Sequence, residues 1–398
     1  MFNSHQVEVA SYWQIFDKNG NIVKEEFPKY QNCNIEEHLD IEIKRSDGSI
    51  RLFKQVPFKS FTKNFLDILY GALTSTMVSG VSAIKTTGGS SQVTSGFGQT
   101  NAAAADDSFG ILIGSSNTAI DLTNYQLASK IVHGSDPGKM LYGSMSFGQT
   151  NAWPGAQGAQ FKIERTFTNN TSDQSDVTIQ EVGLAIKSGT NSFLIARDRV
   201  TYTTAAALNE VVAFGEIIKV TYYFTVVSSS NLNINWIRIL ESIFSVRNVS
   251  IVPTTSTAPI SINFGGTAAA GNKLNLMAPA GDSSFGVIVG EATMASSTII
   301  TSSSLGQQIL HSNPGMNYGQ VNSTVYTTVL PDMGEIMFSR DVINTSTGTS
   351  FTLKEFGLAC AGNGSNNRIL ISHLELGPAV IDPTQFFRGY FKFKIRAL

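Results

Sequence analysis

The sequence predicts an all-β-dominated protein with a minor helical part. It comprises two tandem antiparallel β-sandwich domains and an N-terminal β-hairpin arm. Short runs rich in Val, Ile, Thr, Tyr and Phe alternate with clusters of Gly, Asn, Ser and Asp, a pattern typical of sandwich strands and their turns. Only 15% of the residues are charged, against roughly 25% in average globular proteins. In addition, residues 61–228 resemble residues 229–398, which indicates a duplicated domain.

The N-terminal arm, residues 1–60, has no counterpart in the second repeat. Alternating apolar residues flank the segments 17–21 and 46–49, whose Asp, Asn, Ser and Gly residues favour tight chain reversals. Two β-hairpins are therefore expected. We predict that they form a small sheet, or an arm that packs on the first repeat or on a neighbouring subunit.

A short amphipathic helix is predicted at the start of each repeat. Apolar residues recur there at positions i, i+3, i+4 and i+8, which places them on one helical face. They are Phe65, Ile68, Leu69 and Leu73 in the first repeat, and Trp236, Ile239, Leu240 and Phe244 in the second. A stretch rich in Gly, Ser and Thr follows the first helix, and we expect it to be a loop.

The segment 108–114, Ser-Phe-Gly-Ile-Leu-Ile-Gly, recurs at 284–290 as Ser-Phe-Gly-Val-Ile-Val-Gly. An apolar run bounded by glycine predicts a buried core strand. A phosphate-binding loop is excluded here, because such a loop would lead directly into a helix.

An arginine and a glutamate recur on opposite sides of a turn in each repeat. Arg165 and Glu181 flank the polar segment 169–176, and Arg340 and Glu355 flank the equivalent turn of the second repeat. Residues placed symmetrically about a turn oppose each other in an antiparallel hairpin. A partly buried carboxylate also needs a partner. We therefore predict two structural ion pairs, Arg165 with Glu181 and Arg340 with Glu355.

One histidine recurs at matching positions in the two repeats. His133 and His311 each stand just before a turn that contains Pro-Gly. A single histidine in such a place is more typical of a structural residue than of a metal ligand. We predict that each imidazole bonds to nearby backbone groups.

The sequence contains no phosphate-loop, nucleophile-elbow or zinc-protease motif. Cys33 and Cys360 are far apart, so two free thiols are expected, and no metal or cofactor is predicted. The net charge of −2 gives no support for nucleic-acid binding, which needs clustered Lys and Arg. Neither a secretory leader nor an apolar run of about 18 residues is seen, so we expect synthesis in a cytoplasm and no membrane span.

Three aspartates precede the repeated strand segment: Asp106, Asp107 and Asp282. Paired acids are used by glycoside hydrolases and by cation sites. Aspartate at this place is also common in turns, and only one of the three positions recurs in both repeats. A hydrolase that uses Asp106, Asp107 or Glu181 stays open as a third function class, behind the two below.

The first repeat resembles structural proteins of tailed bacteriophages and related prokaryotic viruses. The resemblance lies in the order of a G-[IV]-x-[IV]-G strand, a D-x-x-x-Y-x-L-x-x-x-I-x-H-G stretch, R-x-F-x-N and [IV]-x-E-[IV]-G-L. These motifs are carried by Gly110, Ile111, Ile113, Gly114, Asp121, Tyr125, Leu127, Ile131, His133, Gly134, Arg165, Phe167, Asn169, Glu181, Val182, Gly183 and Leu184. The second repeat departs from the pattern, since Asp121 and Tyr125 have no clear counterparts there and Ser312 replaces Gly134.

The resemblance implies a non-enzymatic virion protein that decorates the capsid or belongs to the neck or tail. Such a protein would act by self-association and by docking on other virion proteins, and it would be found in the virion after synthesis in the host cytoplasm. The alternative is a receptor- or carbohydrate-binding adhesin, whose aromatic and Asn-rich loops would stack on sugars.

Overall fold

A computed structural model gives the architecture of most of the chain. It describes residues 5–57, 61–74, 84–92, 98–152, 158–200, 210–228, 235, 238–239, 242, 249–251, 260–262, 275–292, 304–312, 315–330, 333–361 and 368–396. The all-β-dominated fold class is confirmed, because antiparallel strands make up most of the described residues. Among these residues no helix has the length and apolar character needed to cross a membrane.

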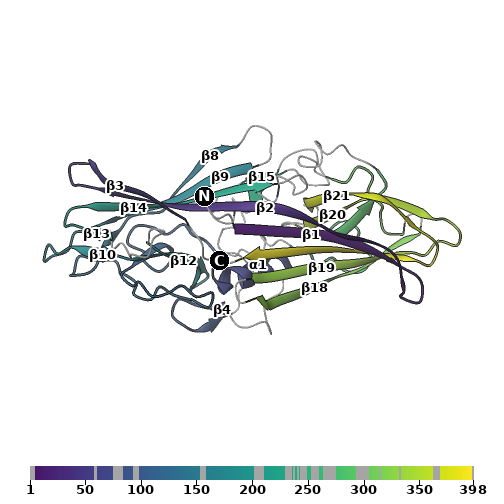
Figure 1. Ribbon diagram of the computed structural model, residues 1–398, viewed down its shortest axis with the longest axis horizontal. Helices are drawn as coiled ribbons and strands as arrows, with labels where there is room; N and C mark the ends of the chain where they lie inside the picture. The colour runs from purple at the N-terminus through teal and green to yellow at the C-terminus, as the bar shows by residue number, and fades with distance from the viewer. Residues whose placement is uncertain are drawn as a thin grey trace.

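One ten-stranded sheet runs through the molecule (Figure 1). Its strands are β1 (His5–Phe16), β2 (Ile22–Lys44), β3 (Ile50–Pro57), β7 (Leu141–Tyr142), β8 (Ser146–Ala152), β9 (Gly158–Thr168), β14 (Ile217–Ser228), β18 (Met316–Leu330), β19 (Met333–Asn344) and β22 (Phe386–Arg396). The order is β18-β19-β22-β1-β2-β14-β9-β7, with β3 beside β2 and β8 beside β9. Equivalent strands of the two repeats therefore lie on opposite sides of the N-terminal arm, which forms the middle of the sheet.

Smaller sheets form the second layer of each sandwich. In the first repeat they are β6 (Gly110–Gly114), β11 (Glu181–Ser188) and β12 (Asn191–Arg199), with β10 (Val177–Ile179) paired to β13 (Glu210–Val212). In the second they are β17 (Gly286–Gly290), β20 (Phe351–Ala361) and β21 (Arg368–Ile381). Two short pairs complete the fold: β4 (Ile84–Lys85) with β5 (Ser91–Gln92), and β15 (Val249–Ile251) with β16 (Ile260–Ile262).

The N-terminal arm packs on both repeats of its own chain. Strand β1 pairs with β22, the last strand of the second repeat, and β2 pairs with β14, the last strand of the first. The two halves of the sheet meet at Cys33–Ile35, whose backbone pairs with β1 on one side and with β14 on the other. The predicted domain boundaries at residues 60 and 228 stay predictions, because one sheet runs through all three segments.

The two arm hairpins are copies of one another. Gly20 and Gly48 have positive φ angles of 84° and 85° at equivalent places in the two turns. The pairing register shifts at the same point of each hairpin, between Ile15 and Phe16 and between Ile43 and Lys44. Each hairpin thus extends the sheet of one repeat in the same way.

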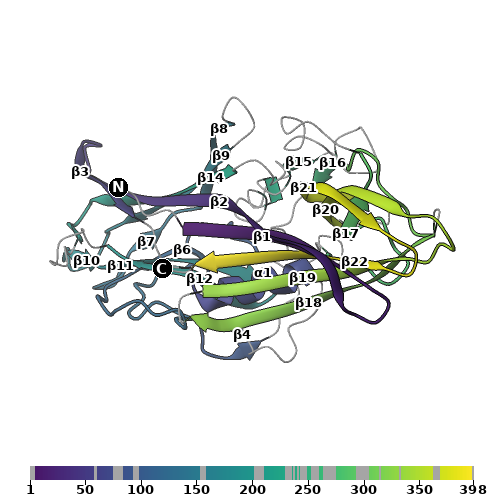
Figure 2. The same cartoon turned by 45° about the vertical axis from the view of Figure 1, so that its right-hand side comes forward.

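The core lies between the large sheet and the small ones (Figure 2). Trp13 and Ile15 on β1, and Ile41 and Ile43 on β2, are buried at alternating positions. In the second repeat, the ring of Phe356 on β20 contacts the rings of Phe387 and Phe391 on β22, which joins the two layers.

The first predicted helix is present as α1 (Lys63–Thr74), and Phe65, Ile68 and Leu69 are buried on one face, as the periodicity indicates. Asn64 Nδ2 donates to the Leu194 carbonyl at 3.1 Å, which ties α1 to β12. The side chain of Leu73 lies outside the described residues.

The second predicted helix is described only in part. Asn235, Arg238, Ile239 and Ser242 are helical, and Ile239 is buried, whereas Trp236, Leu240 and Phe244 lie outside the described residues. Asn235 Nδ2 donates to the Leu370 carbonyl at 3.2 Å, which is the counterpart of the Asn64 contact.

Gly110 and Gly286 begin the repeated core strands with φ angles of 79° and 77°, a region that other residues rarely adopt. A Cβ atom would lie 3.0 Å from Ala102 Cβ at Gly110, but only 2.5 Å from Val321 Cγ2 at Gly286. We expect Gly110→Ala to lower the free energy of unfolding by about 1–2 kcal/mol and Gly286→Ala by more. Urea unfolding would measure this. Gly377→Ala is the matched control, since no atom lies within 4 Å of its Cβ position. Equal stability of Gly286→Ala and the native chain would contradict the prediction.

Candidate functional site

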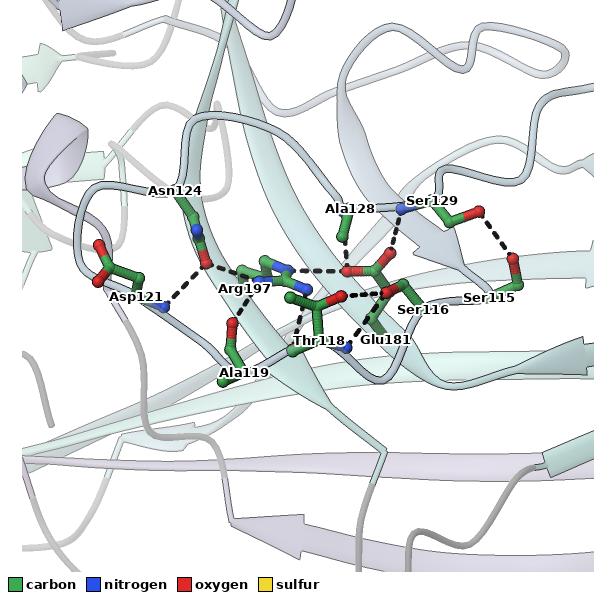
Figure 3. A network of polar contacts seen from close by, with 10 residues as sticks. All are labelled: Ser115, Ser116, Thr118, Ala119, Asp121, Asn124, Ala128, Ser129, Glu181 and Arg197. Carbon is green, nitrogen blue, oxygen red and sulfur yellow. Dashed lines mark hydrogen bonds and ion pairs between the residues drawn. The ribbon is translucent and has the colours of Figure 1, made fainter.

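The candidate site is the loop Ser115–Lys130, to which Glu181 on β11 and Arg197 on β12 bond in the first repeat (Figure 3). Much of this loop is exposed, including Asn117, Thr118 and Thr123. Leu127 and Ile131 are buried and anchor the end of the loop in the core. The loop contains Asp121, Tyr125 and Leu127 of the D-x-x-x-Y-x-L-x-x-x-I-x-H-G stretch.

Glu181, at the start of β11, holds one end of this loop. Its carboxylate accepts hydrogen bonds from the backbone amides of Ala128 at 3.1 Å and Ser129 at 2.8 Å. The third donor is Arg197 Nε on β12, at 2.7 Å. The Glu181 side chain is fully buried, so its charge is balanced within the protein and it is not accessible as a catalytic base.

Arg197 holds the other end of the loop. Its Nη1 atom donates to the Ala119 carbonyl at 3.2 Å and to Asn124 Oδ1 at 2.7 Å, and its Nη2 atom donates to the Thr118 carbonyl at 3.2 Å. Asn124 Oδ1 also accepts the Asp121 amide (Figure 3). Asp121 Oδ1 in turn accepts the Thr123 amide. We call Glu181, Arg197 and their bonds to the loop the loop clamp; it fixes the shape of an exposed surface.

The predicted ion pair between Arg165 and Glu181 is wrong. Strand β9, which carries Arg165, pairs with β14, β7 and β8, whereas β11, which carries Glu181, pairs with β12 and β6. The chain changes sheets within the turn after Thr168, so the two residues do not face each other across one hairpin. The same correction applies to Arg340 and Glu355, since Arg340 lies on β19 and Glu355 on β20.

Arg165 instead spans the sandwich and donates five hydrogen bonds to backbone carbonyls. Nε donates to Gly143 at 2.8 Å, Nη1 to Phe109 and Ile111 at 3.1 Å, and Nη2 to Ala103 at 3.1 Å and Asp106 at 2.6 Å. The guanidinium also lies 4.7 Å from the centre of the Tyr142 ring. Burial lowers the pKa of Arg165 to about 10, which still leaves it charged at neutral pH.

Arg340 repeats this arrangement in the second repeat. Its donors reach the carbonyls of Gly319, Phe285, Val287, Pro279 and Asp282, the equivalents of the five acceptors around Arg165. Burial lowers its pKa to about 10 as well. We call each buried arginine with its five acceptors an arginine hub. Each hub joins β6 or β17 to the large sheet.

The second repeat keeps the glutamate of the loop clamp but changes its partner. Glu355 accepts the amides of Gly306 at 3.1 Å and Gln307 at 2.9 Å, and its third partner is His373 Nε2 at 2.8 Å. Burial acts to raise the pKa of Glu355, but the bonds from His373 and the two amides outweigh it, so the pKa lies below its ordinary value. The imidazole of His373, a group that can lose its charge, thus takes the place of the permanently charged guanidinium of Arg197.

The repeated histidines bond to backbone amides. Tyr142 N donates to His133 Nδ1 at 3.1 Å, and Tyr318 N donates to His311 Nδ1 at 3.2 Å. Both tyrosines are buried, and their hydroxyls donate to the carbonyls of Ile131 and Ile309.

The aspartates before the repeated strands serve the local turns. Asp106 Oδ1 accepts the Ser108 amide at 2.9 Å, and Asp282 Oδ1 accepts the Ser284 amide at 2.8 Å. Asp107 accepts the His133 amide at 2.6 Å and pairs with Lys130. Within the described residues, no group of three His, Cys, Asp or Glu side chains is placed to hold a metal ion.

The structure describes the side chain of one of the two cysteines. Cys360 is a buried free thiol, and burial raises its pKa. The side chain of Cys33 lies outside the described residues.

Sequence reasoning missed Arg197 and His373, the partners of the two clamp glutamates. One signal for Arg197 was present, because a cation in the apolar run Phe193–Arg197 needs a buried acceptor. No comparable signal marked His373, because the aligned run of the second repeat places Ser372 opposite Arg197. In the structure Arg197 pairs with Gly183, and His373 pairs with the equivalent Gly357. The linear alignment of these two strands is therefore one residue out of register. Comparisons of the chain with known protein families, curated proteins and solved structures found no match.

Proposed function

We propose that this chain is a non-enzymatic structural component of a tailed-virus particle, located in the capsid decoration, the neck or the tail. It works by self-association and by docking on other virion proteins. The observation that carries this proposal is the loop clamp. In both repeats the buried glutamate is fully engaged in fastening an exposed loop, an arrangement that preserves the shape of a surface. The resemblance of the clamped segment to virion proteins points to the same function.

The two repeats would offer different docking surfaces. The loop of the first repeat is polar, and hydrogen bonds from Arg197 hold its backbone in place. Its polar residues include Asn117, Thr118, Asp121 and Thr123. The second repeat has no counterpart of Asp121 or of Tyr125 in its sequence, and His373 replaces the arginine. A duplicated protein with unlike loops suits an assembly in which one chain contacts two different neighbours.

The proposal predicts that purified particles contain this chain in a fixed, symmetric stoichiometry. Electron microscopy and mass spectrometry of intact virions would measure it. Because Asn117 is exposed on the clamped loop, Asn117→Arg is expected to reduce incorporation about tenfold or more, as loss of a docking contact does. Thr324→Arg on β18 is the control, since Thr324 is exposed on another element. Absence of the chain from intact virions would overturn the proposal.

A further inference from the structure

The molecule carries exposed apolar side chains at both ends of its long axis. At one end lie β3 and β13, and at the other lies the turn between β1 and β2 (Figures 1 and 2). We define tip 1 as Ile50, Phe53, Val211 and Phe214, and tip 2 as Ile22, Val23, Ile343 and Val380. These eight residues are 37–56% exposed, although large apolar side chains are usually buried.

Two residues of each tip occupy equivalent places in the fold. Ile50 and Ile22 follow equivalent hairpin turns, and each pairs with the last residue before its turn, Lys44 or Phe16. Val211 and Val380 pair with Thr178 and Thr352, which are equivalent residues of the small sheets. These pairings fix the backbone and do not require an apolar side chain, so folding alone does not explain why both repeats keep one there.

Each tip is held together by a side chain that crosses from the arm hairpin to the repeat. Arg51 Nη2 donates to the Val211 carbonyl at 2.6 Å and pairs with Glu216 at tip 1. Lys24 Nζ donates to the Pro378 carbonyl at 3.1 Å near tip 2. Each tip is therefore one preformed surface to which the arm and the repeat both contribute.

The charges beside the tips have opposite order. The turn at tip 1 carries Arg45 followed by Asp47, whereas the turn at tip 2 carries Asp17 followed by Lys18. Arg45 and Asp17 occupy equivalent places, since each amide bonds to the carbonyl of the residue four positions later. When the equivalent places of two tips face each other, Arg45 meets Asp17 in a contact between tip 1 and tip 2, whereas it meets a second Arg45 in a contact between two copies of tip 1. Complementary charge favours the unlike contact.

We infer that copies of this chain associate end to end, with tip 1 of one copy docked on tip 2 of the next. The occupant of each tip is thus a second copy of the chain. Such a head-to-tail contact produces rings when the rotation closes and filaments when it does not. This inference rests on the proposed structural function and specifies its self-association.

Sedimentation velocity over about 1–100 µM chain would test the contact. We expect the native sedimentation coefficient to rise with concentration. The tip 1 variant Ile50→Asp/Phe214→Asp and the tip 2 variant Ile22→Asp/Val380→Asp should each remain monomeric alone, because a charge would be buried in the contact. A mixture of the two should form dimers and nothing larger, since each dimer joins the one intact tip of each partner.

A charge variant tests the orientation of the contact. Lys18 is exposed, and Lys18→Asp would place like charges opposite Asp47, which should weaken association about two- to fivefold at low salt. Thr324→Asp on the edge strand β18 is the matched control and should associate like the native chain. Circular dichroism of all the variants would check that they are folded.

Several results would overturn the inference. They are a native chain that stays monomeric at every concentration, tip variants that associate like the native chain, a variant mixture that stays monomeric, or loss of association in Thr324→Asp. The proposed function fails separately. If virions contain the chain and tip variants are incorporated normally, the end-to-end contact is wrong and the structural function stands; absence from virions removes the function itself.

Discussion

Replacement of Arg165 by methionine is expected to destabilise the protein by more than about 4 kcal/mol, and Arg340→Met by a similar amount. Each arginine is almost fully buried and donates to five backbone carbonyls of the arginine hub. Methionine has a similar length but cannot donate. A buried polar group without a partner costs about 1–3 kcal/mol, so several such carbonyls together exceed the effect of most single substitutions.

Guanidinium unfolding followed by intrinsic fluorescence would measure the loss. Arg165→Lys should recover only part of the stability, because an ammonium group has three donors and lacks the planar fork that reaches both layers. Arg388→Met is the control: its side chain is 36% exposed and pairs with the partly exposed Asp341, so we expect a change of about 0–1 kcal/mol. A hub variant within about 1 kcal/mol of the native chain would show that water replaces the lost donors.

The arginine hubs also show which contacts could not be predicted from the sequence. The recurrence of Arg165 and Arg340 identified two residues under the same structural demand, and the alternation of apolar residues predicted their β environment. Their acceptors are backbone carbonyls, which every residue possesses, so the sequence contains no mark of them. From spacing alone, an acidic side chain is the partner that the sequence indicates for each arginine.

The all-β class followed from composition and periodicity, because those reflect burial along each strand. The pairing of β1 with β22 could not be predicted from composition and periodicity. It joins residues near the two chain ends and depends on which sheet edges stay open after each repeat folds. The similarity of the two arm hairpins was visible in the repeated Asp, Asn, Ser and Gly turns. Their separate attachment to the two repeats could only come from the three-dimensional arrangement.

The loop clamps differ in a way that predicts unequal effects of one substitution. Glu181→Gln leaves Arg197 charged and buried without a counter-ion, which is expected to cost about 3–5 kcal/mol. Glu355→Gln leaves His373, which can become neutral and keep a hydrogen bond to the amide, so a cost of about 1–2 kcal/mol is expected. Urea unfolding at neutral pH would compare the two. An equal loss of unfolding free energy in Glu181→Gln and Glu355→Gln would contradict the role assigned to the permanent charge of Arg197.

The cost of Glu355→Gln should also depend on pH. The pKa of Glu355 lies below its ordinary value in the folded protein, so its carboxylate adds stability at pH values above about 4.3, the pKa of an unfolded glutamate. That stability is lost as the pH falls through the lower, folded pKa. The difference in unfolding free energy between native and Glu355→Gln chains should therefore be full at pH 7 and shrink below about pH 4. A difference that stays constant or grows on acidification would refute this.

Asp136→Asn provides the control for this pH series, because the Asp136 side chain is 69% exposed and its ion pair with Lys139 lies on the surface. Its unfolding curve should follow that of the native chain at each pH. If Glu355→Gln behaves as expected, acid weakens the clamp of the second repeat by protonating Glu355, whose carboxylate then no longer accepts hydrogen bonds as an anion.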